Sequence, residues 1–529
     1  YLFLRGQGVK IFSLVSKECA MNNTLIPVIK YENEEVNIDD KAYNDNKEVM
    51  FEYGEDADIV TVDNDGGYEG AIVLKPNPGI YLKEPVTVLD YASLYPSSMI
   101  SENLSHDSII LEDNEDSKKY LGDDGITELD KIGYDHVDVT HDVYKWINPN
   151  IKSKGKEKVG IKTCRFAQCR DGSKSIIPDI LRKLLKARKD TRKKIVFKTI
   201  VYNDPEDSTE KSFSGLYDEK DGVHTISTLS GEKVTVNDAN KISIKDTYND
   251  FEKTVFDGLQ LAFKITANSL YGQIGARTSP IYLKDIAAST TATGRKLLYL
   301  AKDKTKEYFK DADIVYGDTD SIFINFNPKD EHGKPLENRE ALKKSIDMGV
   351  EVEKYIQQFL KPPHKLEYEK TFWPFILFSK KRYIGNKYEF KTGEYDYKQT
   401  SMGVVSKRRD NAEIVKHVYC GVIDILMNQQ NLKLSIDFLR GELNKLLDGG
   451  FDMNMLVVTK SLRGYYKNPD QIAHKVLADR MGVRDPGNKP SSNDRIPYAY
   501  IEVKESKNVK VLQGNRIEHP DFIKENNLK

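Results

Sequence analysis

The pattern of hydrophobic and polar positions is clearest around residues 314–324. β-Branched and aromatic residues lie on both sides of a short polar turn, which predicts a β-hairpin with Asp318 and Asp320 at its tip. Two like charges this close repel each other unless a cation lies between them, so the turn is a candidate metal-ion platform; a solvated acidic turn would show the same pattern. A calcium loop is excluded, because the sixth and twelfth positions counted from Asp318 are Phe323 and Lys329 instead of Gly and Glu.

A second apolar run, residues 86–89, predicts a buried strand that ends at Asp90. The residues that follow predict a turn into a helix that starts near Pro96. Such a turn would hold Asp90 and the backbone around Tyr91 in place, which makes Asp90 another candidate site carboxylate. The alternative is that Asp90 only caps this helix.

Residues 178–193 predict a helix opened by Pro178, because the Leu positions recur with helical period. Arg188 and Arg192 share one face of it, four residues apart. Guanidinium groups bind phosphate oxygens in a bidentate manner, so this pair suits a triphosphate. A merely solvated basic face would look the same.

Residues 260–272 predict another helix, with Gly272 just beyond its last turn. Lys264, Asn268 and Tyr271 fall on one face. A cation, an amide and an aromatic ring in one stripe suit a phosphate and a stacked base or sugar, although a Tyr at this spacing is also typical of core.

Between these two helices, residues 200–250 are polar and rich in Gly, Asp and Asn. Residues 223–229 and 233–236 predict a hairpin within this stretch. We interpret the region as an insertion without chemistry of its own.

After the acidic hairpin, residues 366–370 alternate as a strand, and residues 380–383 place three cations beside a Tyr. Such a run suits the backbone of a nucleic acid, although it is also common on plain surfaces. Long helical stretches follow from about Gly403.

Composition narrows the class of protein. With 529 residues the chain has room for roughly three or four domain-sized units and a large core. The net charge of −2 conceals a basic block at residues 151–200, with 17 Lys or Arg against 4 Asp or Glu, which favours a polyanion site or a solvated helix face. Residues 31–66 hold 13 acidic residues against 2 Lys, as expected of a solvated loop.

Four cysteines, Cys19, Cys164, Cys169 and Cys420, are too few for a disulfide framework and predict thiols in a reducing, intracellular compartment. Cys164 and Cys169 resemble half of a zinc site, but no second Cys or His pair with ligand spacing accompanies them, so we interpret them as ordinary thiols. No run of about 18 apolar residues is present to span a membrane.

Three motifs in chain order carry a family resemblance. Residues 90–97 (Asp-Tyr-Ala-Ser-Leu-Tyr-Pro-Ser), 264–272 (Lys-x-x-x-Asn-Ser-x-Tyr-Gly) and 316–321 (Tyr-Gly-Asp-Thr-Asp-Ser) resemble the three polymerase motifs of family B DNA polymerases. Further similarity lies in the segments Arg5-Gly6-Gln7, Tyr68-Glu69-Gly70-Ala71, Lys380-Lys381-Arg382-Tyr383, Arg408-Arg409-Asp410 and Arg495-Ile496-Pro497-Tyr498. The composition and the polar insertion resemble polymerases of large nucleocytoplasmic DNA viruses.

The resemblance implies an α+β, right-hand polymerase fold with an antiparallel-sheet palm, helical fingers and a helical thumb. Its expected parts are residues 1–62 (remnant of an exonuclease domain and linker), 63–174 (first part of the palm), 175–280 (fingers, with an insertion at 200–250), 281–400 (second part of the palm) and 401–529 (a truncated thumb). We interpret the chain as a fragment, and because the acidic exonuclease motifs would lie upstream of Arg5, we expect no proofreading activity.

The implied chemistry is template-directed DNA synthesis by two-metal-ion nucleotidyl transfer. By resemblance, Asp90 and Asp320 would bind two Mg²⁺ ions, for which Mn²⁺ can substitute, with the Tyr91 carbonyl as a further ligand and Asp318 in or next to the same ligand set. These three aspartates form the implied catalytic set.

The implied substrate contacts follow from the same motifs. Arg188, Arg192 and Lys264 would hold the β- and γ-phosphates, and Tyr95 would exclude a 2′-hydroxyl. The full nucleotide-binding set is Tyr91, Ser93, Leu94, Tyr95, Arg188, Arg192, Lys264 and Asn268, and the DNA-binding set is Lys380, Lys381, Arg382, Tyr383, Tyr68 and Gly70.

The implied partners are primer–template DNA and deoxynucleotides, with a processivity factor as a further candidate and no membrane. The alternative function is that of a catalytically inactive family member that serves as a primer–template scaffold. All three aspartates and Lys264 are present, which argues against it. An ATP-driven nucleic-acid motor is excluded by the absence of a Gly-x-x-x-x-Gly-Lys-Ser/Thr loop.

Overall fold

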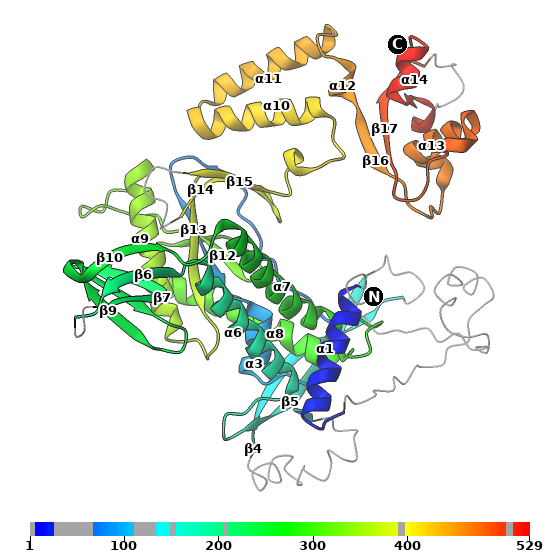
Figure 1. Ribbon diagram of the computed structural model, residues 1–529. Coiled ribbons are helices and arrows are strands. Elements are labelled where there is room, and N and C mark those ends of the chain that lie inside the picture. Colours follow the sequence, from blue (N-terminus) through cyan, green and yellow to red (C-terminus); the bar gives the residue numbers. More distant parts are fainter. Residues whose placement is uncertain are drawn as a thin grey trace, which may run out of the picture.

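The structure is a computed structural model that describes residues 6–25, 67–110, 134–148, 155–205, 209–389, 397–503 and 512–528. Helices and antiparallel sheets both contribute, which confirms the predicted α+β class. Figure 1 shows a central sheet with packed helices, a helical hairpin that carries a smaller sheet at one end, and a C-terminal region of helices and strands.

The central sheet has the strand order β11-β12-β2-β13-β14-β15, and β1 also pairs with β13. The predicted acidic hairpin is β11 and β12, and the strand predicted at 86–89 is β2, so both predictions are confirmed. Strand β13 contains the predicted strand 366–370 and continues well beyond it. The bounds are β1 Gly79–Tyr81, β2 Val86–Tyr91, β11 Asp313–Asp318, β12 Ser321–Asn325, β13 Leu366–Ser379, β14 Arg382–Tyr388 and β15 Lys398–Met402.

Both faces of the central sheet are covered, which is why nearly every residue of β2 is buried. On one face, Leu89 and Ile322 pack with Leu298 of α8 (Lys284–Tyr308) and Val352 of α9 (Asn338–Gln357). On the other face, an aromatic cluster surrounds Val88; its rings are Tyr316, Phe323, Phe372, Phe375 and Tyr383. Removing one such buried ring would cost about 3–5 kcal/mol, so the sheet is a rigid base for the side chains at its edge.

The helical hairpin consists of α6 (Ile176–Ile195) and α7 (Asp250–Ile274). The chain between them folds into a five-stranded sheet of order β10-β6-β7-β8-β9. The hairpin predicted at 223–229 and 233–236 is β8–β9 and is confirmed. The bounds are β6 Lys198–Asn203, β7 Glu210–Lys220, β8 Val223–Ser227, β9 Lys233–Asn237 and β10 Lys241–Asp246.

Helix α7 is longer at both ends than its predicted range. Its N-terminus has a capping box, in which Asn249 and Glu252 bond each other's backbone N–H groups. The prediction that Gly272 follows the last turn is wrong: the helix continues to Ile274, and its C-cap is Gly275. Ile274 is fully buried, and this packing extends the helix past the glycine.

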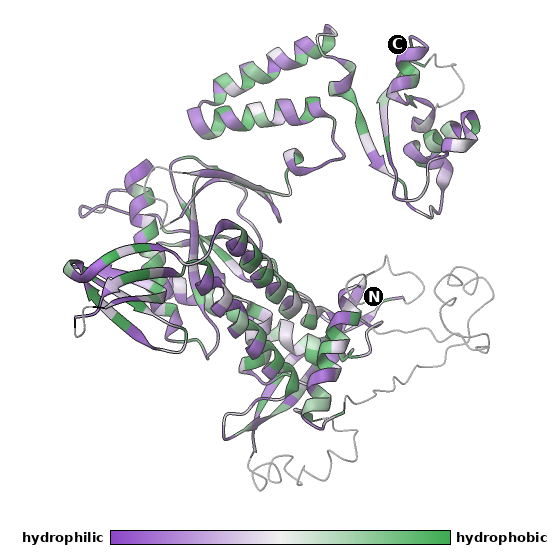
Figure 2. Ribbon diagram, viewed as in Figure 1, coloured by the Kyte–Doolittle hydropathy of each residue, from purple (hydrophilic) through white to green (hydrophobic). Residues whose placement is uncertain are grey.

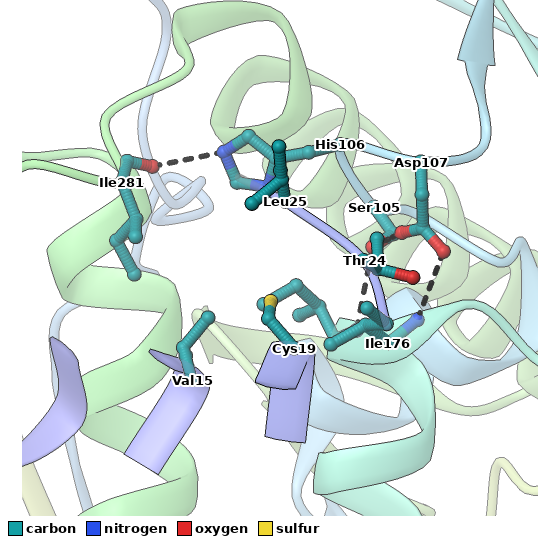
Figure 3. Close-up of a pocket in the computed structure, with 10 residues that line it drawn as sticks. Val15, Cys19, Thr24, Leu25, Ser105, His106, Asp107, Ile176 and Ile281 are labelled. Carbon is teal, nitrogen blue, oxygen red and sulfur yellow. Dashed lines mark hydrogen bonds between the residues drawn. The ribbon is translucent and has the colours of Figure 1, made fainter. Parts of the chain in front are cut away.

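The N-terminal helix α1 (Gln7–Met21) packs against α6 and α7 through Ile11 and Val15. Residues 1–5 lie outside the described residues, so Arg5 of the predicted exonuclease-side segment cannot be placed. Figure 3 shows a small, partly open pocket at this junction, where the His106 ring nitrogen Nε2 bonds the Ile281 carbonyl at 3.1 Å. Its lining is mostly apolar and contributes to packing.

A three-stranded sheet beside these helices was not predicted. It contains β3 (Ile109–Ile110), β4 (Tyr134–Trp146) and β5 (Lys156–Cys169), in the order β3-β5-β4. Strand β4 also packs against α8. Part of the basic block 151–200 therefore lies on exposed positions of β5, and part on α6.

The C-terminal region was predicted to be helical, and this prediction is incomplete. Its strands β16, β17 and β18 form a sheet around Leu477 and Ile496. Figure 2 shows hydrophobic and hydrophilic stretches alternating along the two long helices, α10 and α11. The bounds are α10 Glu413–Asp424, α11 Leu432–Leu447, α12 Met453–Leu456, β16 Val458–Ser461, α13 Ala473–Arg484, β17 Arg495–Tyr500, β18 Ile517–Glu518 and α14 Pro520–Glu525.

None of the four cysteines forms a disulfide, which agrees with the expectation that they make no disulfide framework. Among the described residues, none of the helices is both long enough and apolar enough to span a bilayer.

Candidate active site

The sheet register brings together two carboxylates that are far apart in the sequence. Asp90 lies near the end of β2 and pairs with Ser321, the first residue of β12. The Tyr91 amide donates a hydrogen bond to the Asp320 carbonyl at 2.8 Å. The backbone of these two strands therefore places Asp90 next to Asp320.

The acidic turn itself is tightly held. Thr319, between the two aspartates, has a φ of 58°, a left-handed conformation that a β-branched residue rarely adopts. The Thr319 amide bonds the Ile72 carbonyl at 3.0 Å, and the Asp320 amide bonds the Asp318 carbonyl at 2.7 Å. Such local strain persists where the surrounding structure over-determines it, and it is frequent at functional sites.

The acids of this site repel each other. Burial, together with the nearby Asp320 and Glu369, raises the pKa of Asp90 to about 7. Burial also raises the pKa of Asp320, as do Asp318 and Glu369. Lys264 acts in the opposite direction on both groups. Glu369 was missed in the sequence, where it was only one polar position of an alternating strand.

Asp318 lies in a different environment. The Lys381 Nζ lies 2.6 and 2.8 Å from its two carboxylate oxygens, and the Tyr316 hydroxyl donates to it at 3.2 Å. The Lys381 amide in turn donates to the Tyr316 hydroxyl at 2.9 Å. Asp318 therefore has partners within the chain, whereas Asp90 and Asp320 face other acids.

The turn after β2 presents backbone rather than side chains. Tyr91 is buried, and its hydroxyl donates to the Leu297 carbonyl at 2.8 Å. Helix α3 (Leu94–Ser101) starts slightly before Pro96, and its N-cap is Ser93, with a left-handed φ of 54°. The alternative that Asp90 caps this helix is thereby excluded. Leu94 is buried in the core below the turn.

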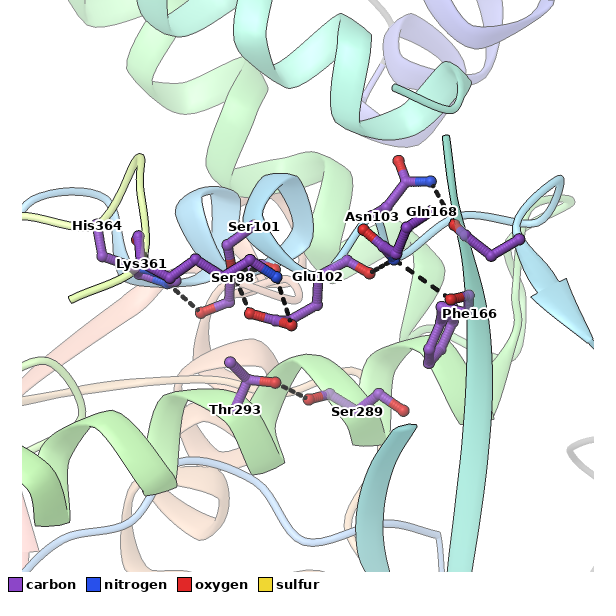
Figure 4. A network of polar contacts seen from close by, with 11 residues as sticks. Ser98, Ser101, Glu102, Asn103, Phe166, Gln168, Ser289, Thr293, Lys361 and His364 are labelled. Carbon is purple, nitrogen blue, oxygen red and sulfur yellow. Dashed lines mark hydrogen bonds and ion pairs between the residues drawn. The ribbon is translucent and has the colours of Figure 1, made fainter. Parts of the chain in front are cut away.

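Helix α3 is also anchored at its C-terminal end (Figure 4). The Lys361 Nζ lies 3.1 Å from the Glu102 carboxylate, and the Ser98 hydroxyl lies 3.2 Å from the His364 Nε2. Lys361 and His364 precede β13, so these contacts connect α3 to a strand that pairs with β2. Both ends of the motif that carries Asp90 are thus fixed to the same sheet.

Tyr95 lies in a slot between two helices. Its ring centroid is 4.7 Å from that of Tyr271 on α7, and a Cβ on Gly294 of α8 would approach the Tyr95 ring to 3.0 Å. The Tyr68 and Tyr271 hydroxyls lie 3.5 Å apart, and the Tyr68 hydroxyl leaves no room for a side chain at Gly275. Sequence placed Tyr95, Tyr271 and Tyr68 in separate motifs, and the structure brings them together.

The backbone of Glu69 and Gly70, which precede β1, is held by side chains of α8. Arg295 Nη1 donates to the Glu69 and Gly70 carbonyls at 2.8 and 2.9 Å, and the Thr291 hydroxyl donates to the Glu69 carbonyl at 2.7 Å. Arg295 was missed because a single Arg in a helix carries no signal in the sequence. The predicted DNA contacts of Tyr68 and Gly70 stay predictions.

The helical hairpin carries the predicted cations. The Arg188 Nε donates to the Gln260 side chain of α7 at 3.3 Å, and burial together with Arg192 lowers the pKa of its guanidinium. Lys264 and Asn268 lie on the exposed face of α7. Since Lys264 lowers the pKa of both Asp90 and Asp320, this exposed face of α7 is electrostatically linked to the acids through Lys264.

The predicted DNA-binding run is divided between surface and core. Lys380 Nζ donates to the Val73 carbonyl at 2.9 Å, Lys381 pairs with Asp318, and Arg382 is exposed. The Tyr383 ring packs inside the aromatic cluster of the central sheet, with burial raising its pKa to about 12. DNA contacts by these residues stay predictions, and Tyr383 in any case contributes packing.

The donor set fits hard divalent cations. Carboxylate and carbonyl oxygens are the ligands that Mg²⁺ and Mn²⁺ prefer, and the site offers Asp90, Asp320, Glu369 and the Tyr91 carbonyl. Cations between these acids would offset both the burial of their charges and their mutual repulsion, the two effects that raise the pKa values of Asp90 and Asp320.

Comparison with known proteins identifies the family. A sequence model of DNA polymerase family B matches residues 1–204 and 217–529. The chain is 52% identical over 529 residues to a DNA polymerase of Pyramimonas orientalis virus, an alignment that covers 100% of the chain and 39% of that protein.

Two further relatives extend the comparison. A DNA polymerase of Phaeocystis pouchetii virus is 36% identical over 398 residues, which cover 71% of this chain and 30% of that protein. The DNA polymerase delta catalytic subunit of Candida albicans is 28% identical over 535 residues, which cover 100% of this chain and 39% of that protein. The chain thus spans 30–39% of the length of these relatives.

Proposed function

Because the chain belongs to DNA polymerase family B, we propose that it extends the 3′ end of a DNA primer by adding deoxynucleotides along a template. The observation that carries this proposal is the pair Asp90 and Asp320, which β2 and the adjoining β11–β12 turn bring together and which face other acids. The cationic face of α7 lies within electrostatic reach of them. This arrangement suits the metal ions and the triphosphate of the reaction.

The proposed right-hand arrangement follows the expected parts. We assign the central sheet with α3, α8 and α9 to the palm. The fingers are α6 and α7, together with the five-stranded sheet formed by the chain that connects them. The thumb is the region from residue 401. Helix α1 packs against the proposed fingers, so residues assigned to an exonuclease remnant support the polymerase core. The two viral relatives are consistent with the expected viral type.

In the proposed mechanism, Asp90, Asp320 and the Tyr91 carbonyl hold two Mg²⁺ ions, for which Mn²⁺ can substitute. Ions held there would supply the charge that activates the primer 3′-hydroxyl and stabilises the leaving pyrophosphate. Asp318 supports the turn through Lys381 and lies next to the ligand set. The Ser93 and Leu94 backbone lies in the same turn, where it suits the triphosphate.

The proposed role of the hairpin is to hold the substrate. Arg188, Arg192 and Lys264 bind the β- and γ-phosphates, with Asn268 beside them. Charge-assisted hydrogen bonds of this kind are worth about 1.5–3 kcal/mol each. Closing of α6 and α7 over a correct base pair would complete the site and make nucleotide selection depend on the template.

Primer extension by the purified chain tests this function. We expect template-dependent extension with deoxynucleotides and Mg²⁺, and none after chelation. A chain that shifts primer–template DNA on a gel without extending it would contradict the proposal and favour the inactive scaffold.

Tyr95 is the proposed barrier to ribonucleotides. Because Tyr271 and Gly294 fix its ring, Tyr95→Ala should open space under the sugar and raise ribonucleotide incorporation by about 100-fold. Tyr271→Phe keeps the stacked ring and is the matched control. Unchanged discrimination in Tyr95→Ala would remove this role.

A further inference from the structure

A second group of metal-ligating side chains lies away from the acidic turn. His141 of β4, Cys164 of β5 and Asp285 of α8 each offer one ligand atom, and these atoms lie within 4.8 Å of one another. His141 and Cys164 are 4% exposed, and the Asp285 side chain is 14% exposed. Sequence had paired Cys164 with Cys169 instead, because a ligand set drawn from three elements has no fixed spacing.

Strand register and helix period explain why these residues meet. His141 pairs with Lys162, and Val139 pairs with Cys164, so all four side chains point to one face of the β4–β5 hairpin. That face packs against α8, where Asp285 and Ser289 are four residues apart and share a side. The cluster therefore lies in the interface between the hairpin and the helix.

Two of the three ligand distances are close to those of tetrahedral coordination. The Cys164 Sγ is 3.6 Å from the His141 Nε2, which is 3.8 Å from the Asp285 Oδ1. Zinc bonds of about 2.3 Å to sulfur and about 2.0–2.1 Å to nitrogen or oxygen place tetrahedral ligands about 3.3–3.6 Å apart. The third pair, the Cys164 Sγ and an Asp285 carboxylate oxygen, lies within 4.8 Å, so the carboxylate would move closer when all three atoms bind one ion.

The orientation of His141 favours a metal over a proton relay. Its Nδ1 donates to the Asp142 carbonyl at 3.3 Å, so in the neutral ring the Nε2 lone pair points toward Cys164 and Asp285. In a relay, the thiol and the carboxylate would lie on opposite ring nitrogens, whereas here both are next to Nε2. A backbone partner for the other nitrogen is the usual environment of a metal-binding His.

Two neighbours complete the surroundings. The buried Ser289 Oγ has no hydrogen-bond partner among the described residues; Figure 4 shows Thr293 bonded to the Ser289 carbonyl instead. Burial and the nearby Asp285 raise the pKa of the Cys164 thiol, whereas Lys162 and the adjacent Ser289 hydroxyl act in the opposite direction. Lys162 Nζ binds the other Asp285 oxygen, Oδ2, at 2.9 Å, which leaves Oδ1 directed to the cluster.

We propose that His141 Nε2, Cys164 Sγ and Asp285 Oδ1 bind one Zn²⁺ ion, with the Ser289 hydroxyl or a water molecule as the fourth ligand. Binding releases the thiol proton, and the charges of thiolate, carboxylate and zinc then sum to zero. The ion would fasten the β4–β5 hairpin to the first turns of α8. The same helix holds the Glu69–Gly70 backbone and the Tyr95 slot, so the site is a structural support, and it stands whether or not the chain synthesises DNA.

Cobalt substitution tests the site directly. Co²⁺ added to the metal-free 529-residue chain should give the intense visible bands of tetrahedral cobalt and a near-ultraviolet band from thiolate-to-cobalt charge transfer, saturating at one ion per chain. Carboxylates of the acidic turn cannot produce the thiolate band. Zn²⁺ should then displace the cobalt and remove both bands.

Variants decide which residues are responsible. Cys164→Ser should abolish the thiolate band, and Asp285→Asn should weaken Co²⁺ binding by more than about 10-fold. Cys169→Ser, on the same strand but outside the cluster, should keep the band. Far-ultraviolet circular dichroism checks folding, and Zn²⁺ should raise the Tm of the unmodified chain even if a variant fails to fold. A wild-type chain without the thiolate band, or a Cys164→Ser chain that keeps it, would overturn the proposal.

Discussion

Two groups of charged side chains in this molecule contain aspartates whose pKa values are shifted in opposite directions. At the acidic turn, Asp90 faces Asp320 and Glu369, and its pKa is raised to about 7 by burial and by these neighbours. In the sheet of the helical hairpin, Asp238 accepts hydrogen bonds from Lys241 at 2.6 Å and from His224 at 2.7 Å, and these partners lower its pKa to about 2.

The difference lies in where the countercharge comes from. Asp238 has its cation, Lys241, within the chain, and Tyr217 completes the network by bonding the His224 Nδ1 at 2.8 Å. Neither Asp90 nor Asp320 has an ion pair with a cation among the described residues; Lys370 and Lys264 only partly offset the effect of burial and of the acidic neighbours on Asp90, and Lys264 does so on Asp320. An acid with internal partners contributes to the fold, whereas acids gathered against each other are suited to ions from outside.

The largest predicted effect separates the two groups by activity. Asp90→Asn and Asp320→Asn should each lower the primer-extension rate by at least about 10³-fold, since each removes a charge that holds the metal ions. Asp238→Asn, the matched control, should extend primers at the unmodified rate. Circular dichroism would confirm that each variant folds, and a fast Asp320→Asn chain would break the distinction.

The second-largest predicted effect compares two lysines of α7, one with an ion-pair partner in the described part of the chain and one without. Lys253 is paired with Asp246 at 2.6 Å, whereas Lys264 has no ion pair among the described residues. Lys264→Ala should lower kcat/KM for deoxynucleotides by about 10–100-fold through loss of a phosphate contact. Lys253→Ala should change it by less than about 3-fold. Equal effects in steady-state kinetics would argue against the assigned phosphate site.

Lys381 is the intermediate case, because it pairs with Asp318 and is also a predicted DNA contact. If it contacts a phosphate, Lys381→Ala should weaken primer–template binding and lower the slope of log K against log salt by about 0.9. Lys387→Ala on β14, where the lysine is paired with Glu389, is the control. An unaltered slope would mean that Lys381 acts only as the countercharge of Asp318.

The smallest predicted effect is on thermal stability. At neutral pH the substitution of Asp90 should raise the Tm, whereas the substitution of Asp238 should lower it. Because the pKa of Asp90 rises from 3.8 to about 7 on folding, the folded chain binds an extra proton between these values, and stability falls as pH rises through them. Asp90→Asn should therefore raise the Tm at pH 7.5 by at least about 2 °C in the absence of divalent ions.

Asp238 has a lowered pKa, so its contribution is present at neutral pH and is lost as pH falls toward 2. Asp238→Asn should lower the Tm at pH 7.5 and have no such effect at very low pH. Thermal denaturation of both variants against pH measures this contrast. A shift of the same sign in both at pH 7.5 would contradict it.

The sequence alone predicted the fold and the candidate site where a local hydrophobic pattern coincides with a motif. The β11–β12 hairpin, β2 and the hairpin β8–β9 are set by apolar runs between turns, and the motifs singled out Asp90 and Asp320. Contacts between distant segments carried no such signal. Glu369, Arg295 and the pairing of Lys381 with Asp318 depend on register and on packing against α8, which single positions in a sequence do not reveal.

The longer elements were predicted less well. The β4–β5 hairpin is long and largely exposed, so it lacks a clear apolar alternation. Helix α7 passes Gly272 because Ile274 is buried in tertiary contacts, which outweigh the intrinsic preference of glycine for a helix end.

The central claim is that Asp90 and Asp320 hold two metal ions. Electron paramagnetic resonance can count the Mn²⁺ ions bound to the chain in complex with a dideoxy-terminated primer–template and the next deoxynucleotide. The Mn²⁺ ions that the nucleotide and the DNA bind without the protein are subtracted from the count. Ions at the proposed site of His141, Cys164 and Asp285 are removed from the count by the Cys164→Ser substitution. We predict two ions for this chain and for its Asp238→Asn variant, and fewer for Asp320→Asn. Two tightly bound ions in Asp320→Asn would contradict the account.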